Sequence, residues 1–329
     1  MLRAVLTDFR HCAVGRTITM LDKRLAGMSL PADEVVQVYP EQYAQTFTAL
    51  LARCTAALII APETDGILAD LSARVLAAGK FLLGSRPEAI SLTGDKWKCH
   101  KILHRAGLPV PLTSLASFSN ATTAASKIGY PLVLKPVDGV GCEGVCMVDH
   151  ERRLPDALAL VRRVSRRKEV LMQSFIPGKH ASVSLLVTED RILPLSLNDQ
   201  NLLISFPFTY RGGTVPLDHP ARKQAYAAAQ AAVKLFPGLR GYVGVDLVLA
   251  GDGNPQKTPG RPGGVAGSSQ AQEKVWLIEI NPRLTTSYLG LRRVAHINLA
   301  HAIWQACCLG KSPPVVRLEG RADFFKFDL

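Results

Sequence analysis

The feature that most constrains this chain is an apolar run, residues 275–283, with a carboxylate in its middle. Its β-branched and aliphatic residues predict a buried strand. Glutamate is almost never fully buried without a partner, so Glu279 needs a balancing group. Because side chains alternate along a strand, Glu279, Asn281 and Arg283 share one face. Two oxygen-bearing side chains on a rigid strand predict a Mg²⁺ site with a fixed cation beside it.

A second carboxylate lies in an apolar run upstream. Residues 241–249 also predict a strand, and Asp246 within it is costly to bury unless a cation compensates its charge. Between the two strands, residues 251–273 are rich in Gly, Pro, Ser and Gln, and predict a disordered hairpin extension. Without that insertion the strands become antiparallel neighbours, so we expect Asp246, Glu279 and Asn281 to form one metal site.

A glycine-punctuated loop follows a strand that ends in a lysine. Residues 130–136 predict the strand, Lys135 lies near its end, and Gly139, Gly141 and Gly144 follow. Glycines let backbone N–H groups approach phosphates closely, and a lysine supplies a point charge. The lysine precedes the loop, unlike in a Walker A motif, and residues 145–148 predict a strand rather than a helix. A plain hairpin with glycines at its tip is the alternative.

Further segments suit a nucleotide and its co-substrates. Asp95 favours the start of a helix at Lys96, whose side chain on its own is more typical of a surface. The strand over residues 170–176 ends in an edge that could face adenine, with Phe175 and Ile176 as apolar walls or simply as core. Residues 195–213 are polar and broken by glycine, and we interpret them as a substrate loop.

The N-terminal 92 residues predict an α/β lobe. Residues 1–10 are interpreted as a first strand, and residues 56–84 as a strand–helix–strand unit with a parallel sheet. A ligand could lie at the carboxyl ends of these strands, near Pro62 and Glu63, although acidic loop residues are more often merely solvated.

Composition narrows the class of protein. A chain of 329 residues predicts two or three domains. Seven scattered cysteines, with no CxxC pair, argue for reduced thiols and against a zinc site. The net charge of +12 is dispersed without aromatic interleaving, so we expect a surface that attracts nucleotides rather than a nucleic-acid partner. No apolar run is long enough to cross a membrane and no signal core is seen, so a cytoplasmic location is expected.

Taken in order, these motifs resemble the ATP-grasp superfamily of carboxylate–amine ligases over roughly residues 55–310. The resemblance implies two α+β subdomains that sandwich ATP, preceded by an α/β lobe. The expected boundaries are residues 1–92 for the lobe, 93–172 for the small subdomain with the glycine-rich loop, and 173–329 for the large subdomain with the metal site. Small-molecule substrates and no membrane partner are expected, and a homodimer is compatible with the sequence.

The resemblance also implies roles for individual residues. Lys96 and Lys135 would contact ATP phosphates, and Arg283 would steady the transferring phosphoryl group. The metal ligands for Mg²⁺ would be Asp246, Glu279 and Asn281. The adenine-binding edge would consist of Gln173, Ser174, Phe175 and Ile176. Many relatives carry a glutamate for the ribose where this chain has His180.

Within the superfamily, residues 197–200, 210–213 and 281–288 resemble the branch that contains tyramine–glutamate ligase of methanofuran biosynthesis. Substrate contacts would then come from Asn198, Tyr210, Arg211, Gly212 and Arg292, because an arginine fork matches a carboxylate. Three alternatives stay open from the sequence. The first is another ATP-grasp ligase, which acts on a different amino acid or adds glutamates to a cofactor. The others are a non-catalytic nucleotide-binding module and a basic nucleic-acid-binding protein.

Overall fold

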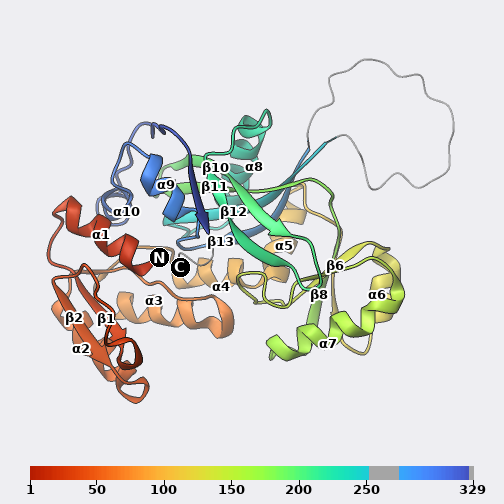
Figure 1. Cartoon of the computed structure of the whole chain (residues 1–329), viewed down its shortest axis with the longest axis horizontal. Helices are drawn as coiled ribbons and strands as arrows, with labels where there is room; N and C mark the ends of the chain where they lie inside the picture. The colour runs from red at the N-terminus through yellow and green to blue at the C-terminus, as the bar shows by residue number, and fades with distance from the viewer. Residues whose placement is uncertain (252–273, 326–329) are drawn as a thin grey trace.

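The computed structural model describes residues 1–251 and 274–325. Its N-terminal lobe holds two small parallel sheets, β1–β2 and β3–β4, with helices around them (Figure 1). The elements are α1 Leu2–Cys12, β1 Ile18–Asp22, β2 Glu34–Val38, α2 Tyr43–Arg53, β3 Ala56–Ala57, α3 Ile67–Ala77, β4 Phe81–Leu82 and α4 Pro87–Gly94. The parallel pairing of β3 with β4 confirms the strand–helix–strand prediction for residues 56–84.

The prediction of a first strand at residues 1–10 is wrong, because this segment is helix α1. Its apolar residues Val5 and Phe9 are four apart, which places them on one side of a helix. Both are buried in the cluster that α10 Leu299–Cys308 also joins. Leu6, the next apolar position, packs toward β1 instead. Tertiary packing on two sides of the segment therefore stabilises a helix rather than a strand.

A four-stranded antiparallel sheet carries the glycine-rich loop. Its order is β5-β8-β6-β7, and α6 Ala121–Ile128 and α7 Leu154–Val164 form an outer layer over it (Figure 1). The strands are β5 Thr113–Ser117, β6 Leu132–Lys135, β7 Cys146–Val148 and β8 Glu169–Ser174. Because β6 pairs with β7, the loop between them is the tip of a hairpin.

A six-stranded antiparallel sheet, in the order β13-β12-β9-β10-β11-β14, carries the two carboxylates. The strands are β9 Lys179–Val187, β10 Ile192–Leu203, β11 Thr209–Val215, β12 Gly241–Ala250, β13 Lys274–Asn281 and β14 Ala322–Phe325. One face is covered by α5 Lys96–Arg105 and α8 Arg222–Lys234, whose alanines let it pack closely. At the other face, α9 Tyr288–Val294 and α10 pack against the sheet.

The interpretation of residues 195–213 as a loop is wrong, because most of them form β10 and β11 of the large sheet. Polar side chains of this segment form hydrogen bonds with side chains of neighbouring strands. Asn198, with no exposed surface, donates to Ser184 Oγ at 2.9 Å. The predicted disordered insertion, residues 251–273, lies outside the described residues apart from Gly251. The domain boundaries stay a prediction, and within the described ranges no helix is long and apolar enough to cross a membrane.

Candidate active site

The two predicted carboxylates lie directly opposite one another. In the antiparallel β12–β13 ladder Asp246 pairs with Glu279, and a register shift next to this pair leaves Ile278 as the extra residue. Residues directly opposite in a ladder project from the same face. The predicted convergence of Asp246, Glu279 and Asn281 is therefore present, and Asn281 Nδ2 donates to Asp246 Oδ2 at 3.2 Å.

Cations and amides balance this pair of like charges. Lys96 Nζ contacts Glu279 Oε2 at 2.6 Å, and Gln200 Nε2 donates to Asp246 Oδ1 at 2.8 Å. Burial raises the pKa of Asp246, and the neighbouring Glu279 raises it further. Burial alone would raise the pKa of Glu279 as well, but Lys96 and Lys135 outweigh burial and hold this pKa below its ordinary value. The two carboxyl groups can therefore share one proton, and a divalent cation bound between them would replace that proton.

Two lysines approach this pair from different elements. Lys96 is the first residue of α5, and Asp95 caps that helix by accepting from the backbone N–H groups of Trp97 and Lys98. The backbone N–H of Lys96 also donates to Val137 O at 2.9 Å, which ties the helix start to the glycine-rich loop. Lys135 ends β6 and is 5% exposed, and burial lowers its pKa to about 8.

The glycine-rich loop contributes main chain to the site. Gly139 and Gly141 line the cavity described below, and Gly141 has a φ of 63°, which favours glycine. Gly144 has a φ of 71° and packs against Val164, where a Cβ would collide with that side chain. Gly144 thus shapes the loop without lining the cavity.

The edge predicted for adenine carries polar atoms without protein partners. Within residues 1–251 and 274–325, the buried atoms Ser174 Oγ and His180 Nε2 have no hydrogen-bond partner. Burial lowers the pKa of His180, so its imidazole is neutral near pH 7. Gln173 is not free in this way, because its Nε2 donates to Thr113 Oγ1 at 3.0 Å. Orphaned buried polar atoms are costly and suit a polar ligand that would satisfy them.

The carboxylate pair, the two lysines and the adenine edge meet in one cavity of about 220 Å³. Residues of both antiparallel sheets line it. The predicted site residues along its wall are Lys96, Lys135, Gly139, Gly141, Gln173, Ser174, Phe175, Ile176, His180, Tyr210, Asp246, Glu279, Asn281 and Arg283.

Several predicted substrate residues lie elsewhere. Arg292 is held by Asp8 of α1, with its Nε at 2.9 Å from Oδ2, and is absent from the cavity lining. Asn198 is buried, hydrogen-bonded to Ser182 and Ser184 and absent from the lining, and Arg211 is exposed on β11 and also absent from it. Gly212 faces β14, where a Cβ would collide with the main chain of Phe324. Of this group only Tyr210 reaches the cavity, and its hydroxyl contacts Thr286 Oγ1 at 2.6 Å.

Two residues to which no role was assigned from the sequence also belong to this site. Gln200 lines the cavity and holds Asp246, and Glu63 accepts from Arg283 Nε at 2.8 Å. Strand parity could have selected Gln200 once β10 was recognised. Glu63 carried only the weak signal of its place after a strand.

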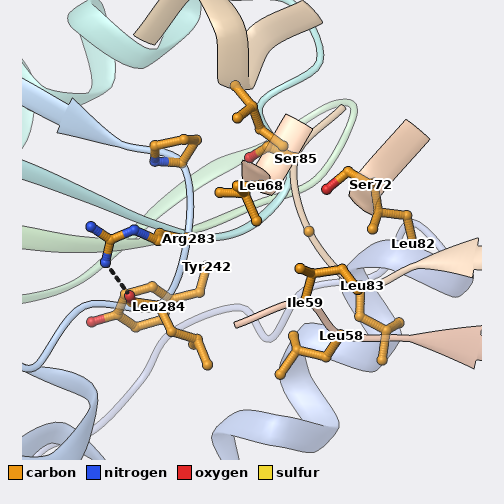
Figure 2. Close-up of a pocket in the computed structure, with 13 residues that line it drawn as sticks. Leu58, Ile59, Leu68, Ser72, Leu82, Leu83, Ser85, Tyr242, Arg283 and Leu284 are labelled. Carbon is orange, nitrogen blue, oxygen red and sulfur yellow. Dashed lines mark hydrogen bonds between the residues drawn. The ribbon is translucent and has the colours of Figure 1, made fainter. Parts of the chain in front are cut away.

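A second, smaller cavity of about 20 Å³ adjoins Arg283 (Figure 2). Mostly apolar side chains of the N-terminal lobe, such as Leu58 and Leu83, line it together with Tyr242. Its volume is enough for about one water molecule, so it is not a substrate site. Figure 2 shows Arg283 at its border, with the guanidinium bonded to Leu284 O.

Two family models match this chain. The model of the ATP-grasp domain matches residues 93–287, and that of the pre ATP-grasp 3 domain matches residues 15–90. The chain belongs to the ATP-grasp family. The tyramine–L-glutamate ligase of Methanocaldococcus jannaschii is 30% identical over 236 residues, which are 72% of this chain. This chain spans only 58% of that relative's length.

Solved structures agree on the ATP-grasp fold. An ATP-grasp superfamily protein from Archaeoglobus fulgidus superimposes with a TM-score of 0.62 at 27% identity, covering 97% of this chain and 82% of that one. Biotin carboxylase from Campylobacter jejuni reaches a TM-score of 0.76 at 18% identity, covering 97% of this chain and 71% of that one. The expected ATP-grasp fold with a preceding N-terminal lobe is confirmed.

The donor set of this ATP-grasp chain fits a hard divalent cation. Asp246, Glu279 and Asn281 offer oxygen atoms from adjacent strands, and Mg²⁺ takes one or two carboxylates together with substrate phosphates. Burial and then the nearby Glu279 raise the pKa of Asp246, and a divalent cation between the two carboxylates would oppose both effects.

Proposed function

We propose that this protein is an ATP-dependent ligase that joins a carboxylate to an amine and releases ADP and phosphate. The observation that carries the proposal is one cavity lined by Lys96, Lys135 and Arg283 together with the Asp246–Glu279 pair. A nucleotide-binding module without catalysis has no need of a third cation beside the carboxylate pair. Phosphoryl transfer does, because negative charge spreads over the transferring oxygens.

The chemistry we propose has two steps. A carboxylate oxygen of the first substrate attacks the γ-phosphorus of ATP, the bond to the β-phosphate oxygen breaks, and ADP leaves. The amine nitrogen then attacks the carbonyl carbon of the acyl phosphate, phosphate leaves, and the nitrogen gives up its proton. The protein forms no covalent bond in either step, so its contribution is positioning and charge stabilisation.

Each group of residues that lines the cavity would have its own role. Lys135 and Lys96 would hold the phosphates under the glycine-rich loop, and Arg283 would stabilise the transferring group. Ser174 and His180, whose buried polar atoms lack protein partners among the described residues, would receive the adenosine. Mg²⁺ held by Asp246, Glu279 and Asn281 would neutralise charge on the phosphate oxygens.

For the substrates we propose L-glutamate, activated at its γ-carboxylate, and tyramine. Support comes from the 30% identity to the ligase of that name in Methanocaldococcus jannaschii. The cavity wall also includes Phe208, Tyr210 and Phe324, which suit an aromatic ring. Arg292 is not proposed as the carboxylate ligand, because Asp8 already occupies its guanidinium.

The test is incubation with Mg-ATP and a panel of amino acids and amines that includes glutamate and tyramine. We expect ADP and phosphate in equal amounts, with an amide product of the mass of γ-glutamyltyramine. Another amide would keep the ligase and change the substrates. Release of AMP, or no ATP turnover with any pair, would overturn the proposal. Glu279→Gln serves as the inactive control.

A further inference from the structure

Glu63, at the edge of the N-terminal lobe, reaches the arginine of the cavity across 220 residues of sequence. We propose that Glu63 is a positioning residue that aims the guanidinium of Arg283 at the transferring phosphoryl group. This inference rests on the proposed function for its catalytic consequence, but its structural part can be tested without turnover.

The guanidinium of Arg283 is fixed at two of its three nitrogens. Nε donates to Glu63 Oε2 at 2.8 Å, and Nη1 donates to Leu284 O at 3.2 Å. Within the described ranges, 1–251 and 274–325, no protein acceptor is recorded for Nη2. Arg283 lines the large cavity and its side chain is 23% exposed, so a ligand in the cavity can reach this side chain. A planar guanidinium held at two points has a defined direction.

Glu63 itself has little freedom. Its side chain is 6% exposed, and the turn behind it is closed by bonds from Gly66 N to Glu63 O and from Leu68 N to Pro62 O, both at 3.0 Å. Gly94 of α4 lies against it, where a Cβ would come within 2.9 Å of Glu63 Cβ. The glycine therefore makes room for this carboxylate, and the lobe presents it rigidly.

The same turn also contacts the glycine-rich loop. Thr64 Oγ1 donates to Asp138 O at 3.0 Å, directly before Gly139. One short turn, residues 63–64, thus touches both the arginine and the segment that leads into the phosphate-binding glycines. The N-terminal lobe is in this way part of the catalytic geometry rather than a passive neighbour.

The experiment compares Glu63→Gln and Glu63→Ala with Asp65→Asn. Asp65 is a matched control because it lies in the same turn, pairs among the described residues with the exposed Arg166, and has a φ of 55°, which suits asparagine. We expect Glu63→Ala to lower kcat about 10²-fold, since small misplacements of a catalytic group cost about this much. The KM for ATP should change by less than about threefold, because Arg283 acts mainly in the transition state.

Glu63→Gln keeps an acceptor oxygen and should lose less turnover than Glu63→Ala. Adding Glu63→Ala to Arg283→Lys should cost little more than Arg283→Lys alone, because Glu63 acts by aiming a guanidinium that lysine lacks. Additive losses, or a KM that rises as much as kcat falls, would show that Glu63 only supports the fold.

A second measurement is independent of turnover. The rate at which phenylglyoxal modifies Arg283, followed by peptide mass in the folded protein, should rise severalfold in Glu63→Ala and stay unchanged in Asp65→Asn. If the wild-type protein ligates no substrate pair but this rate rises, the proposed function fails and the positioning stands. If neither the rate nor kcat changes, the positioning is overturned.

Discussion

Asp246 of β12 faces Glu279 of β13 as its direct ladder partner, and the two carboxyl groups share a hydrogen bond. Like charges so close are tolerated only with compensation, which Lys96 supplies at 2.6 Å from Glu279. Burying two carboxylates side by side costs stability, and this cost gives the first prediction.

Replacing Asp246 by asparagine should abolish turnover while raising stability. Between the ordinary pKa of 3.8 and the folded-state pKa of about 7, the folded protein holds the Asp246 proton that the unfolded chain has lost, so stability falls as pH rises through this range. A neutral isostere removes this penalty, so the metal-free Asp246→Asn protein should exceed wild type in Tm by more at pH 8 than at pH 4. Calorimetric melting without divalent metal checks it, and a lower Tm at pH 8 would contradict it.

Arg283→Ala and Arg283→Lys should separate catalysis from folding. Both should lose turnover by about 10²–10³-fold, as expected for a lost charge stabiliser. Only alanine strands the buried Glu63 without its cation, which costs roughly 3–5 kcal/mol in a buried pair and less here because Arg283 is partly exposed. The measurement is kcat beside denaturant unfolding. Equal stability of the two variants would argue against a structural role for the pair.

Lys135 should leave a pH signature in stability. Burial lowers its folded-state pKa to about 8, below the ordinary value of 10.5. Between these values the unfolded chain binds more protons, so the contribution of Lys135 to stability rises with pH. The difference in unfolding free energy between wild type and Lys135→Met should therefore grow in favour of wild type by up to about 2 kcal/mol from pH 8 to pH 9.5. A flat difference would mean that Lys135 titrates near its ordinary value.

Tyr210→Phe should affect the co-substrates rather than the nucleotide. The change removes the hydroxyl that contacts Thr286 at 2.6 Å, and a hydrogen bond of this kind is worth about 0.5–1.5 kcal/mol. The KM for the amine or the carboxylate should rise roughly two- to tenfold, with the KM for ATP unchanged. Tyr226→Phe, outside the cavity lining, is the matched control. A selective rise in the KM for ATP would place Tyr210 at the nucleotide.

Much of the site followed from the sequence because strand periodicity is local. Alternation placed Glu279 and Asn281 on one face, and two apolar strands around a polar insertion implied antiparallel pairing, which the β12–β13 ladder confirms. The strand that ends in Lys135 and the glycine-rich hairpin were readable for the same reason. Residues 1–10 and 195–213 were misjudged because their form depends on partners: α1 is fixed by its contacts on two sides, and the polar β10–β11 hairpin by neighbouring strands.

The sequence by itself determined which strands carry the carboxylates, the lysine and the glycines, since those properties depend on neighbours two to ten residues away. Only the tertiary structure decided which charges meet. Arg283 finds Glu63 across 220 residues, and Arg292 finds Asp8 across 284, so one arginine faces the cavity and the other is withdrawn from it. Ion pairing over such separations follows from how the lobe packs on the large sheet, and no local pattern encodes it.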